Sequence, residues 1–330
     1  MARVLYVHSR RNTFTDIDRT ALAERFEVVD YYQPRLRVRP LELARKLRRA
    51  DVVFGWFASW HTFAALTLAR LLRKPSVLVI GGFDTARMPE IGYGAQRGGP
   101  RRWVTRRTIA MATRLITNST YSLREIEANL GLGQGRVTLV YHGIPDRFGD
   151  AVEEARPQRM ALTVGVADRV NLERKGLRPF VEAAGHLPDV EFVLAGKWKD
   201  DAIKELRSIA SPNVAFTGYL DDEALDRCFR RAAVYVQPSR HEGFGLSVAE
   251  AMLARCVPVV TDAGALLEVI GDAGVVIDAA APDRVAEGIV RALELGPEAG
   301  DRARRRVLER FPYEMRRDGI CHEVDQALAG

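Results

Sequence analysis

Short apolar segments alternate with helical patterns along this 330-residue chain, which restricts its fold to the α/β class. In the N-terminal half we predict strands at residues 4–7, 26–30, 51–55, 76–80, 115–118 and 137–141, with helices such as 62–72 and 122–130 between them. In the C-terminal half we predict strands within residues 163–169, 190–196, 214–220 and 234–239. Such alternation is typical of a parallel sheet, and ligands of such sheets bind beyond the carboxyl ends of the strands.

The loop after residues 234–239 is the most informative of these turns. Two carboxylates eight positions apart flank a Gly-Phe-Gly turn, and we predict that a helix begins near Leu246 or Ser247. The turn comprises Glu242, Gly243, Phe244 and Gly245, and Glu250 would lie about one turn into the helix. Glycines let a ligand approach the backbone, and the first turn of a helix presents free N–H groups to phosphate. Carboxylates accept hydrogen bonds from hydroxyls, so the turn suits a ligand with anionic and hydroxyl-rich parts.

The Glu-x7-Glu pattern, the Ala-Met that follows it and the segment 256–261 resemble the donor site of retaining glycosyltransferases of family 4. These are the group 1 transferases, a group similar to glycogen synthases and mannosyltransferases. The resemblance implies a GT-B fold, an α/β architecture of two Rossmann-like domains that face each other across a cleft. It covers nearly the whole chain and is most specific from residue 163 to 278.

The resemblance also implies roles for individual residues. Glu242 would hold sugar hydroxyls and Glu250 the ribose, while Arg169 and Lys175, six positions apart, would hold the donor diphosphate. Fixed cations stabilise the negative charge that develops on such a leaving group. Tyr219 and Leu220 would border the nucleotide base. We therefore expect catalytic roles for Glu242, Arg169 and Lys175, and donor binding by Glu250, Gly243, Phe244, Gly245, Leu246, Ser247, Tyr219 and Leu220.

The N-terminal half departs from the family pattern at two places. After the first strand, where the family often has a Gly-Gly pair, this chain has His8-Ser9-Arg10-Arg11. After residues 76–80, where the family often has a histidine, it has Gly81-Gly82-Phe83-Asp84. Gly81, Gly82, Asp84 and Arg10 are candidate contacts of donor or acceptor, and for the two glycines a plain tight turn is an equal alternative. No general base can be named.

Charge and composition limit the classes of molecule that this protein is expected to bind. The chain has a net charge of +6, with arginines concentrated in residues 35–49 and 97–107. This favours an anionic membrane surface or a phosphate-bearing acceptor, the alternative being a solvated helix face. No nucleic-acid motif, metal site or cofactor site accompanies the charge, and no apolar run approaches the roughly 20 residues of a membrane span. Three unpaired cysteines indicate a cytoplasmic protein. We also expect peripheral contact with the inner face of the membrane.

The predicted domains are an acceptor-binding domain at residues 1–150, a nucleotide-sugar-binding domain at 151–310, and a C-terminal helix at 311–330 that crosses back to the first domain, as the resemblance implies. The two prolines, glycine and acidic residues of 145–157 predict a linker.

The predicted activity is retaining transfer of a hexosyl group from a nucleotide-diphosphate sugar to a saccharide or lipid-linked acceptor, by a front-face mechanism without a metal. Such an enzyme would act in polysaccharide or glycolipid biosynthesis. The alternatives are a sugar-nucleotide epimerase or a non-catalytic nucleotide-sugar-binding protein on the same fold; a phosphorylase would need a pyridoxal-type lysine site, which we do not find. The sugar, the choice of uridine or guanosine diphosphate, and the acceptor stay open.

Overall fold

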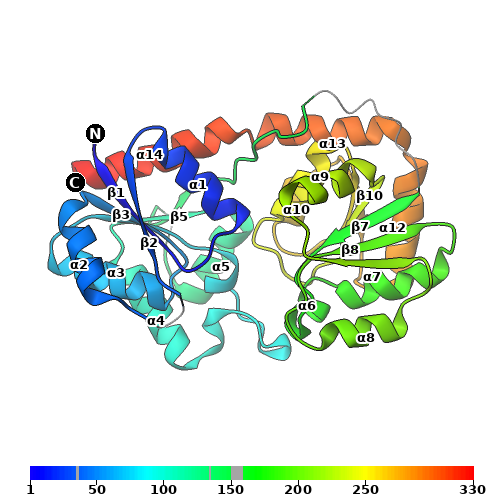
Figure 1. The fold of residues 1–330 in the computed structure, drawn as a ribbon, viewed down its shortest axis with the longest axis horizontal. Helices are drawn as coiled ribbons and strands as arrows, with labels where there is room; N and C mark the ends of the chain where they lie inside the picture. Colours follow the sequence, from blue (N-terminus) through cyan, green and yellow to red (C-terminus); the bar gives the residue numbers. More distant parts are fainter. Residues whose placement is uncertain (35–36, 134, 150–158) are drawn as a thin grey trace. The chain divides into compact units, whose positions relative to one another are not determined.

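A computed structural model describes residues 1–34, 37–133, 135–149 and 159–330, and the chain divides into two compact units (Figure 1). Unit 1 comprises Met1–Pro145 and Phe311–Gly330, and unit 2 comprises Asp146–Arg310. The division therefore falls at the start of the predicted linker 145–157. Residues 150–157 of that linker lie outside the described residues.

Unit 1 is built, within the described residues, on a six-stranded parallel sheet in the order β2-β1-β3-β4-β5-β6. Its strands are β1 (Arg3–His8), β2 (Glu27–Tyr32), β3 (Val52–Trp56), β4 (Ser76–Val79), β5 (Arg114–Thr117) and β6 (Thr138–Leu139). Its helices are α1 (Thr13–Ala23), α2 (Pro40–Arg49), α3 (Trp60–Leu71), α4 (Gly99–Met111), α5 (Thr120–Leu130) and α14 (Tyr313–Ala329), with short turns η1 (Gly82–Asp84), η2 (Pro89–Ile91) and η3 (Ala95–Arg97). Strands β3 and β4 are buried throughout, as a parallel sheet covered on both faces requires.

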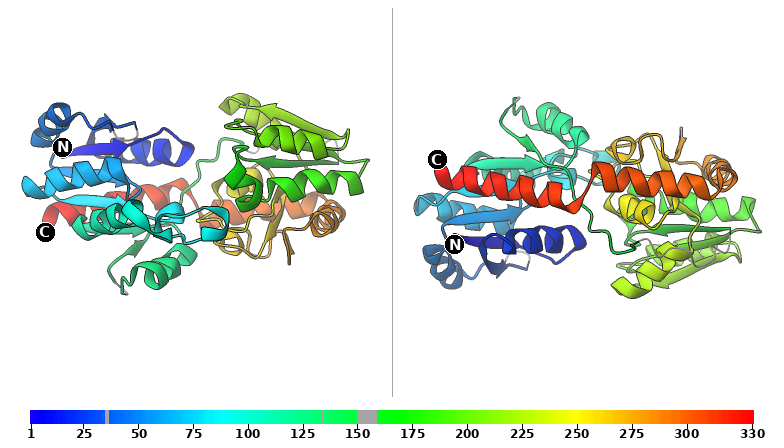
Figure 2. Two further views of the ribbon diagram at one scale, coloured as in Figure 1. Left: turned by 90° about the horizontal axis from the view of Figure 1, so that it is seen from below. Right: turned by 90° about the horizontal axis from the view of Figure 1, so that it is seen from above.

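Two apolar cores cover the two faces of this sheet. One is formed with α2, α3, α4 and α5, for example through Leu47, Leu66 and Ile126. The other is formed with α1 and α14, through residues such as Leu22 and Val324. Helix α14, red in Figure 2, runs along the sheet beside α1. The last residues of the chain are thus part of the core of unit 1.

Unit 2 has, in its described part, a second six-stranded parallel sheet in the order β12-β11-β10-β7-β8-β9. Its strands are β7 (Met160–Val164), β8 (Glu191–Ala195), β9 (Val214–Gly218), β10 (Val234–Gln237), β11 (Val257–Thr261) and β12 (Val275–Ile277). Its helices are α6 (Arg169–Arg174), α7 (Leu177–Ala183), α8 (Ala202–Ile209), α9 (Asp222–Arg231), α10 (Leu246–Leu253), α11 (Leu266–Ile270), α12 (Pro282–Glu294) and α13 (Gly296–Arg310), with the turn η4 (Ala184–His186).

Most predicted elements agree with the observed ones to within two residues; the exception is the strand expected within residues 163–169, which is observed as β7, Met160–Val164. The strand predicted at 137–141 is shortened to β6, Thr138–Leu139, an edge strand that pairs with β5. The predicted start of α10 near Leu246 is observed. Asp221 caps α9, since its side chain accepts a hydrogen bond from the Ala224 amide.

A buried ion pair ties α14 to the rest of unit 1. Arg316 donates from Nε and Nη2 to both oxygens of Asp18 on α1, at 2.8 and 2.6 Å, and from Nη1 to the carbonyl of Val140 at 2.6 Å. Trp56 donates its indole N–H to the same carboxylate. Both charged side chains are inaccessible to solvent, so neither charge has water as an alternative partner.

A second buried carboxylate joins two loops at the end of the sheet. Asp84, which follows β4, is 1% exposed and accepts a hydrogen bond from the Ala58 amide after β3 at 3.1 Å. Burial raises the pKa of Asp84 to about 7, although the backbone N–H groups of Ala58 and Gly81 act against this shift. The carboxyl fixes the loop that carries Gly81 and Gly82.

We expect Asp18→Asn to lower the free energy of unfolding by about 3–5 kcal/mol, because it leaves the Arg316 charge buried without its partner. The measurement is urea-induced unfolding followed by fluorescence. The matched control is Asp325→Asn, which breaks an exposed pair with Arg25 and should change stability by about 0–1 kcal/mol. Equal effects of the two substitutions would contradict the role given to the buried pair.

We expect Asp84 to make unit 1 less stable as the pH rises from about 4 to about 7. In that range the unfolded carboxyl, with its ordinary pKa of 3.8, releases its proton while the folded one keeps it, so unfolding is favoured progressively. Asp84→Asn should therefore gain stability relative to the unmodified chain between pH 5 and pH 7.5. Urea unfolding at several pH values tests this, and parallel pH profiles would refute it.

Candidate functional site

Most of the predicted donor residues of unit 2 gather where the order of its strands reverses. Taken in chain order, the strands of this sheet lie as 3-2-1-4-5-6, with β7 first and β10 fourth, and these two strands pair directly. The chain leaves β7 and β10 at the same end of the sheet, on opposite sides of this switch point. Doubly wound sheets bind their ligands in the crevice at such a position.

Glu242 lies in the loop after β10 and faces cations at the end of α6, the short helix that follows β7. Its Oε2 atom is 3.7 Å from Nζ of Lys175 and 3.6 Å from Nη1 of Arg174. Gln237, the last residue of β10, donates an amide hydrogen to the same oxygen at 2.8 Å. The structure thus brings Glu242 and Lys175 together, as the predicted site requires.

Gln237 is itself held by two hydroxyl groups. Its Oε1 atom accepts hydrogen bonds from Ser247 at 3.0 Å and from Tyr235 at 3.2 Å. Because the amide oxygen is occupied by donors, the amide nitrogen is directed to Glu242. This chain of hydrogen bonds fixes one face of the carboxylate and links it to the first turn of α10.

Two glycines allow the loops to approach Glu242 this closely. Gly176 has a φ of +65°, and a Cβ there would lie 2.2 Å from the carbonyl oxygen of Pro238. Gly264 has a φ of +68°, and a Cβ there would lie 2.1 Å from the carbonyl oxygen of Glu242. The neighbouring Ala265 amide donates to that same oxygen at 2.9 Å. Any larger side chain would push the loops apart.

The Gly-Phe-Gly turn ends at the N-terminus of α10. Gly245 occupies the N-cap position with a φ of +100° and supplies no side chain to cap the helix, while Phe244 is buried. Leu246 and Ser247 are the first helical residues. Their amides lie in the first turn, where a helix favours negative charge.

Glu250 lies one turn further along α10 and is 6% exposed. Its Oε1 atom accepts a hydrogen bond from Nη1 of Arg147 at 2.8 Å, and Arg147 also donates from Nε to Asp226 at 2.6 Å. Glu242 and Glu250 therefore have separate cationic partners.

Burial and neighbouring charges together shift the pKa values of Lys175, Glu242 and Glu250. Burial lowers the pKa of Lys175 below 10.5, and Glu242 offsets this only in part. Burial acts to raise the pKa of Glu242, but Lys175 and Arg174 outweigh it, so that this pKa is lowered. Burial raises the pKa of Glu250 above its ordinary value, and Arg147 offsets only part of the shift. Shifts of this kind are common at functional sites.

The structure does not bring the remaining unit 2 candidates to Glu242. Arg169 begins α6, where its largely exposed side chain donates to Asp201 at 2.9 Å. Tyr219 and Leu220 follow β9, the edge strand, which β8 and β7 separate from β10. The Tyr219 ring is 65% exposed and lies 4.3 Å from Nζ of Lys197.

The unit 1 candidates follow the ends of β1 and β4. Arg10 is exposed in the loop after β1, and its carbonyl lies 3.2 Å from Nδ1 of His8. Gly81 is buried against Asn118, and Gly82 has a φ of +56°. The burial of Asp84 gives it the loop-joining role described above. Contact of these four residues with donor or acceptor stays a prediction.

Sequence reasoning missed several residues of the site, and the signals for them were weak. Arg174 is adjacent to Lys175, but the spacing of cations pointed to Arg169. Gln237 lies inside a predicted strand, and only its position at the carboxyl end of that strand marks it. The others are Tyr235, Gly264 and Arg147.

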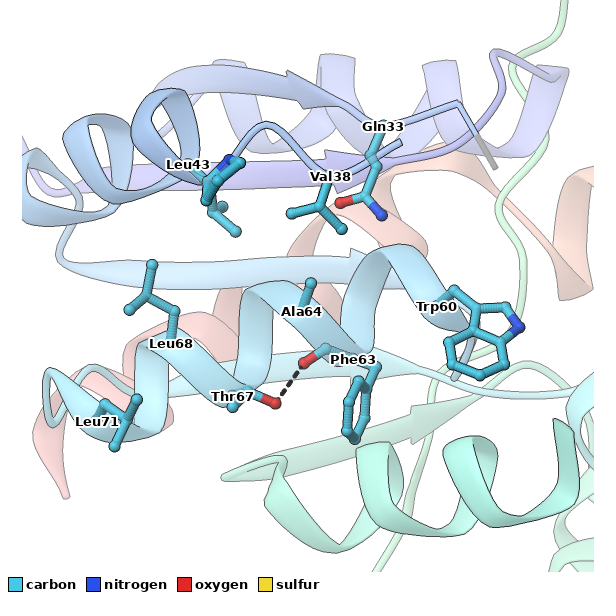
Figure 3. Close-up of a pocket in the computed structure, with 10 residues that line it drawn as sticks. Gln33, Val38, Leu43, Trp60, Phe63, Ala64, Thr67, Leu68 and Leu71 are labelled. Carbon is cyan, nitrogen blue, oxygen red and sulfur yellow. Dashed lines mark hydrogen bonds between the residues drawn. The ribbon is translucent and has the colours of Figure 1, made fainter. Parts of the chain in front are cut away.

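A pocket of about 470 Å³ lies in unit 1, apart from the predicted donor residues (Figure 3). Figure 3 shows Val38 and Leu43 facing Ala64 and Leu68 across it. It is lined mainly by apolar residues of α2, α3 and the segment before α2: Gln33, Val38, Pro40, Leu43, Trp60, Phe63, Ala64, Thr67, Leu68 and Leu71. Within the described ranges, none of the helices is both long and apolar enough to cross a bilayer.

Two family models match the chain. Residues 4–148 match the family described as Glycosyltransferase Family 4, and residues 159–295 match the family described as Glycosyl transferases group 1. These matches correspond to the main parts of units 1 and 2.

Curated relatives include two bacterial mannosyltransferases. The chain is 32% identical over 146 residues to O-antigen chain mannosyltransferase B of Escherichia coli, a match that covers 42% of the chain and 37% of the relative. It is 31% identical over 154 residues to a phosphatidyl-myo-inositol mannosyltransferase of Mycolicibacterium smegmatis, covering 44% and 40%. The matched segments thus span less than half the length of these relatives.

Among solved structures, Anabaena HepE in complex with UDP and glucose is similar over 98% of this chain and 99% of that one. The TM-score is 0.78 and the sequence identity is 16%, so this similarity concerns the fold. It confirms the predicted GT-B architecture. With both units matched by glycosyltransferase families, the chain belongs to the group 1 glycosyltransferases of the family 4 type.

Proposed function

We propose that this protein is a retaining glycosyltransferase that moves a hexosyl group from a nucleotide-diphosphate sugar to a saccharide or lipid-linked acceptor. One observation carries the proposal: the half-buried Glu242 carboxylate is held between Lys175 and Gln237 at the switch point of unit 2, next to the N-terminus of α10. The site thus offers a cation and helix amides to a diphosphate and a fixed acceptor of hydrogen bonds to sugar hydroxyls.

Each part of the donor has a group that suits it. Lys175 and the amides of Leu246 and Ser247 would hold the diphosphate, and Glu250 would accept hydrogen bonds from the ribose. Arg169 would join the diphosphate by exchanging its exposed hydrogen bond to Asp201 for one to phosphate, an exchange of small cost at a solvated position.

The reaction would proceed on one face of the sugar, without a metal ion or cofactor. The bond from C1 of the sugar to the diphosphate oxygen breaks, and the bond from C1 to the acceptor oxygen forms on the same face. A donor phosphate oxygen receives the proton of the acceptor hydroxyl. Lys175 supplies the fixed positive charge that stabilises the leaving diphosphate, an effect typically worth a few kcal/mol in the transition state.

Relatives support a mannosyl group as the sugar transferred. The two curated relatives described above are named mannosyltransferases, whereas another relative is named a glucosyltransferase and the solved structure similar in fold contains UDP and glucose. Donors with uridine and guanosine diphosphate are both candidates.

The pocket of unit 1 supports a lipid-linked acceptor and contact with an anionic membrane surface. Its lining includes Trp60, which is 37% exposed, and Leu71, which is 74% exposed. Arg45 and Arg49 are exposed on α2, which forms one wall of the pocket. Apolar pocket residues and exposed cationic side chains on the same helix suit an amphiphile with an anionic head group.

We expect Lys175→Ala to remain folded and to lower turnover by about a hundredfold or more, because the leaving group loses a fixed charge. Thermal unfolding with UDP, GDP and their sugars first identifies the donor, since a ligand at a hundred times its Kd adds about 2.7 kcal/mol of stability. The control is Lys204→Ala, an exposed lysine on α8.

Near-normal turnover in Lys175→Ala would refute the assigned role. Conversion of the donor sugar without an acceptor would favour an epimerase instead. Tight nucleotide binding with no transfer to a broad panel of acceptors would favour a non-catalytic binding protein.

We expect the chain to bind vesicles that contain 30% phosphatidylglycerol, and Arg45→Glu with Arg49→Glu to weaken that binding by roughly 30-fold or more, since each basic residue near such a surface contributes about 1 kcal/mol. Cosedimentation measures the affinity. Charge reversal of Arg302 and Arg305 on α13 serves as the control. If vesicles of pure phosphatidylcholine bind equally well, the electrostatic part of the proposal is wrong.

A further inference from the structure

Arg147 occupies a position that the proposed donor site does not account for. It is the second residue of unit 2, which begins at Asp146, and it lies 103 positions before Glu250. Its guanidinium is shared between two carboxylates, with Nη1 on Glu250 at 2.8 Å and Nε on Asp226 of α9 at 2.6 Å. The side chain is 31% exposed, whereas that of Glu250 is only 8% exposed. Arg147 thus covers a carboxylate that is otherwise largely buried.

The backbone that carries Arg147 is itself anchored to unit 2. The preceding residue, Asp146, accepts hydrogen bonds from Arg304 of α13 at 2.6 and 3.0 Å, and Arg304 also donates to the Leu253 carbonyl at 2.9 Å. The following residue, Phe148, is buried and packs edge-on against Phe229 of α9. With both neighbours fixed, the position of the Arg147 guanidinium is set by the fold of unit 2.

We propose that Arg147 is the positioning residue of the ribose site. It binds one oxygen of Glu250, Oε1, and so aims the other oxygen, Oε2, at the 2′- and 3′-hydroxyls of a ribonucleoside diphosphate. This inference rests on the proposed function, which assigns the ribose to Glu250. Asp226 has a supporting part, because it holds the guanidinium at a second nitrogen and limits its rotation.

The charges around Glu250 explain why such a residue is needed. Burial disfavours the carboxylate form, and Asp222 and Asp226 of α9 act in the same direction. Arg147 opposes them, and Lys175 contributes a more distant positive charge. The phenol of Tyr235 on β10 is also within electrostatic range. An ionised carboxylate is the stronger hydrogen-bond acceptor, whereas a protonated carboxyl donates from one of its oxygens, so removing Arg147 should weaken the acceptor toward ribose, most strongly at low pH.

The test is calorimetric titration of the full chain with UDP and GDP and with their 2′,3′-dideoxy forms. For the nucleotide that binds, the Kd of the dideoxy form divided by the Kd of the ribo form measures the contribution of the ribose hydroxyls. We expect Arg147→Met to reduce this ratio about tenfold while the Kd of the dideoxy form stays unchanged, and Arg147→Lys to restore part of it. In Arg147→Met the ratio should recover as the pH is raised from 6 to 8.5, which a merely structural role would not produce.

Two further variants keep the result interpretable. Arg230→Met is the matched control: Arg230 lies over the same Phe148 ring at 5.2 Å but is not bonded to Glu250, so the ratio should not change. Glu250→Gln should reduce the ratio on its own, and combining it with Arg147→Met should reduce it little further.

The outcomes separate the inference from the function on which it rests. If neither UDP nor GDP binds the unmodified chain, the proposed function fails and the inference fails with it. If a nucleotide binds with a preference for ribose and Arg147→Met retains that preference, only the inference is overturned. An equal loss of affinity for the ribo and dideoxy forms would likewise overturn it, because it would show a general structural role.

Discussion

The charge of Glu242 is the constraint on which unit 2 depends. A carboxylate that is partly withdrawn from water at the end of a parallel sheet is costly unless cations and hydrogen-bond donors reach it. Lys175 and Arg174 reach it because β7 and β10 are neighbours in the sheet, although they are far apart in sequence. The approach leaves no room for a Cβ at Gly176 or Gly264. The contacts of the Glu242 carboxylate therefore depend both on the order of the strands and on the glycine backbone of the loops.

The sequence was sufficient to predict the fold class, most strand positions and the proximity of Glu242 to Lys175. Each of these residues follows a predicted strand, and strand ends in a parallel sheet share one edge. The resemblance to family 4 glycosyltransferases, which both family models confirm, added the GT-B architecture. The order of the strands in each sheet could not be predicted from the sequence, since alternation of strands and helices is compatible with many orders.

The sequence did not show in which direction individual side chains point, and this was the main reason why residues of the site were missed. Arg169 and Arg174 belong to the same short helix, and nothing in their spacing shows which of them faces Glu242. Arg147 falls in the predicted linker, where ion pairs with residues 79 and 103 positions away leave no local pattern. Asp84 follows a glycine pair whose sequence is compatible with either a tight turn or a ligand contact, whereas its burial depends on how the loop folds back onto Ala58.

The place of α14 in unit 1 has a consequence for the order in which the protein is made. One face of the N-terminal sheet is closed by α1 together with a helix that the ribosome synthesises after all of unit 2. During translation, the Asp18 side chain therefore lacks its ion-pair partner until Arg316, 298 positions later, has been synthesised. Unit 2 can complete its core during translation, whereas unit 1 holds an open apolar face until the last turns of α14 emerge. A nascent chain stalled before residue 311 would be the species most prone to aggregation or capture by chaperones.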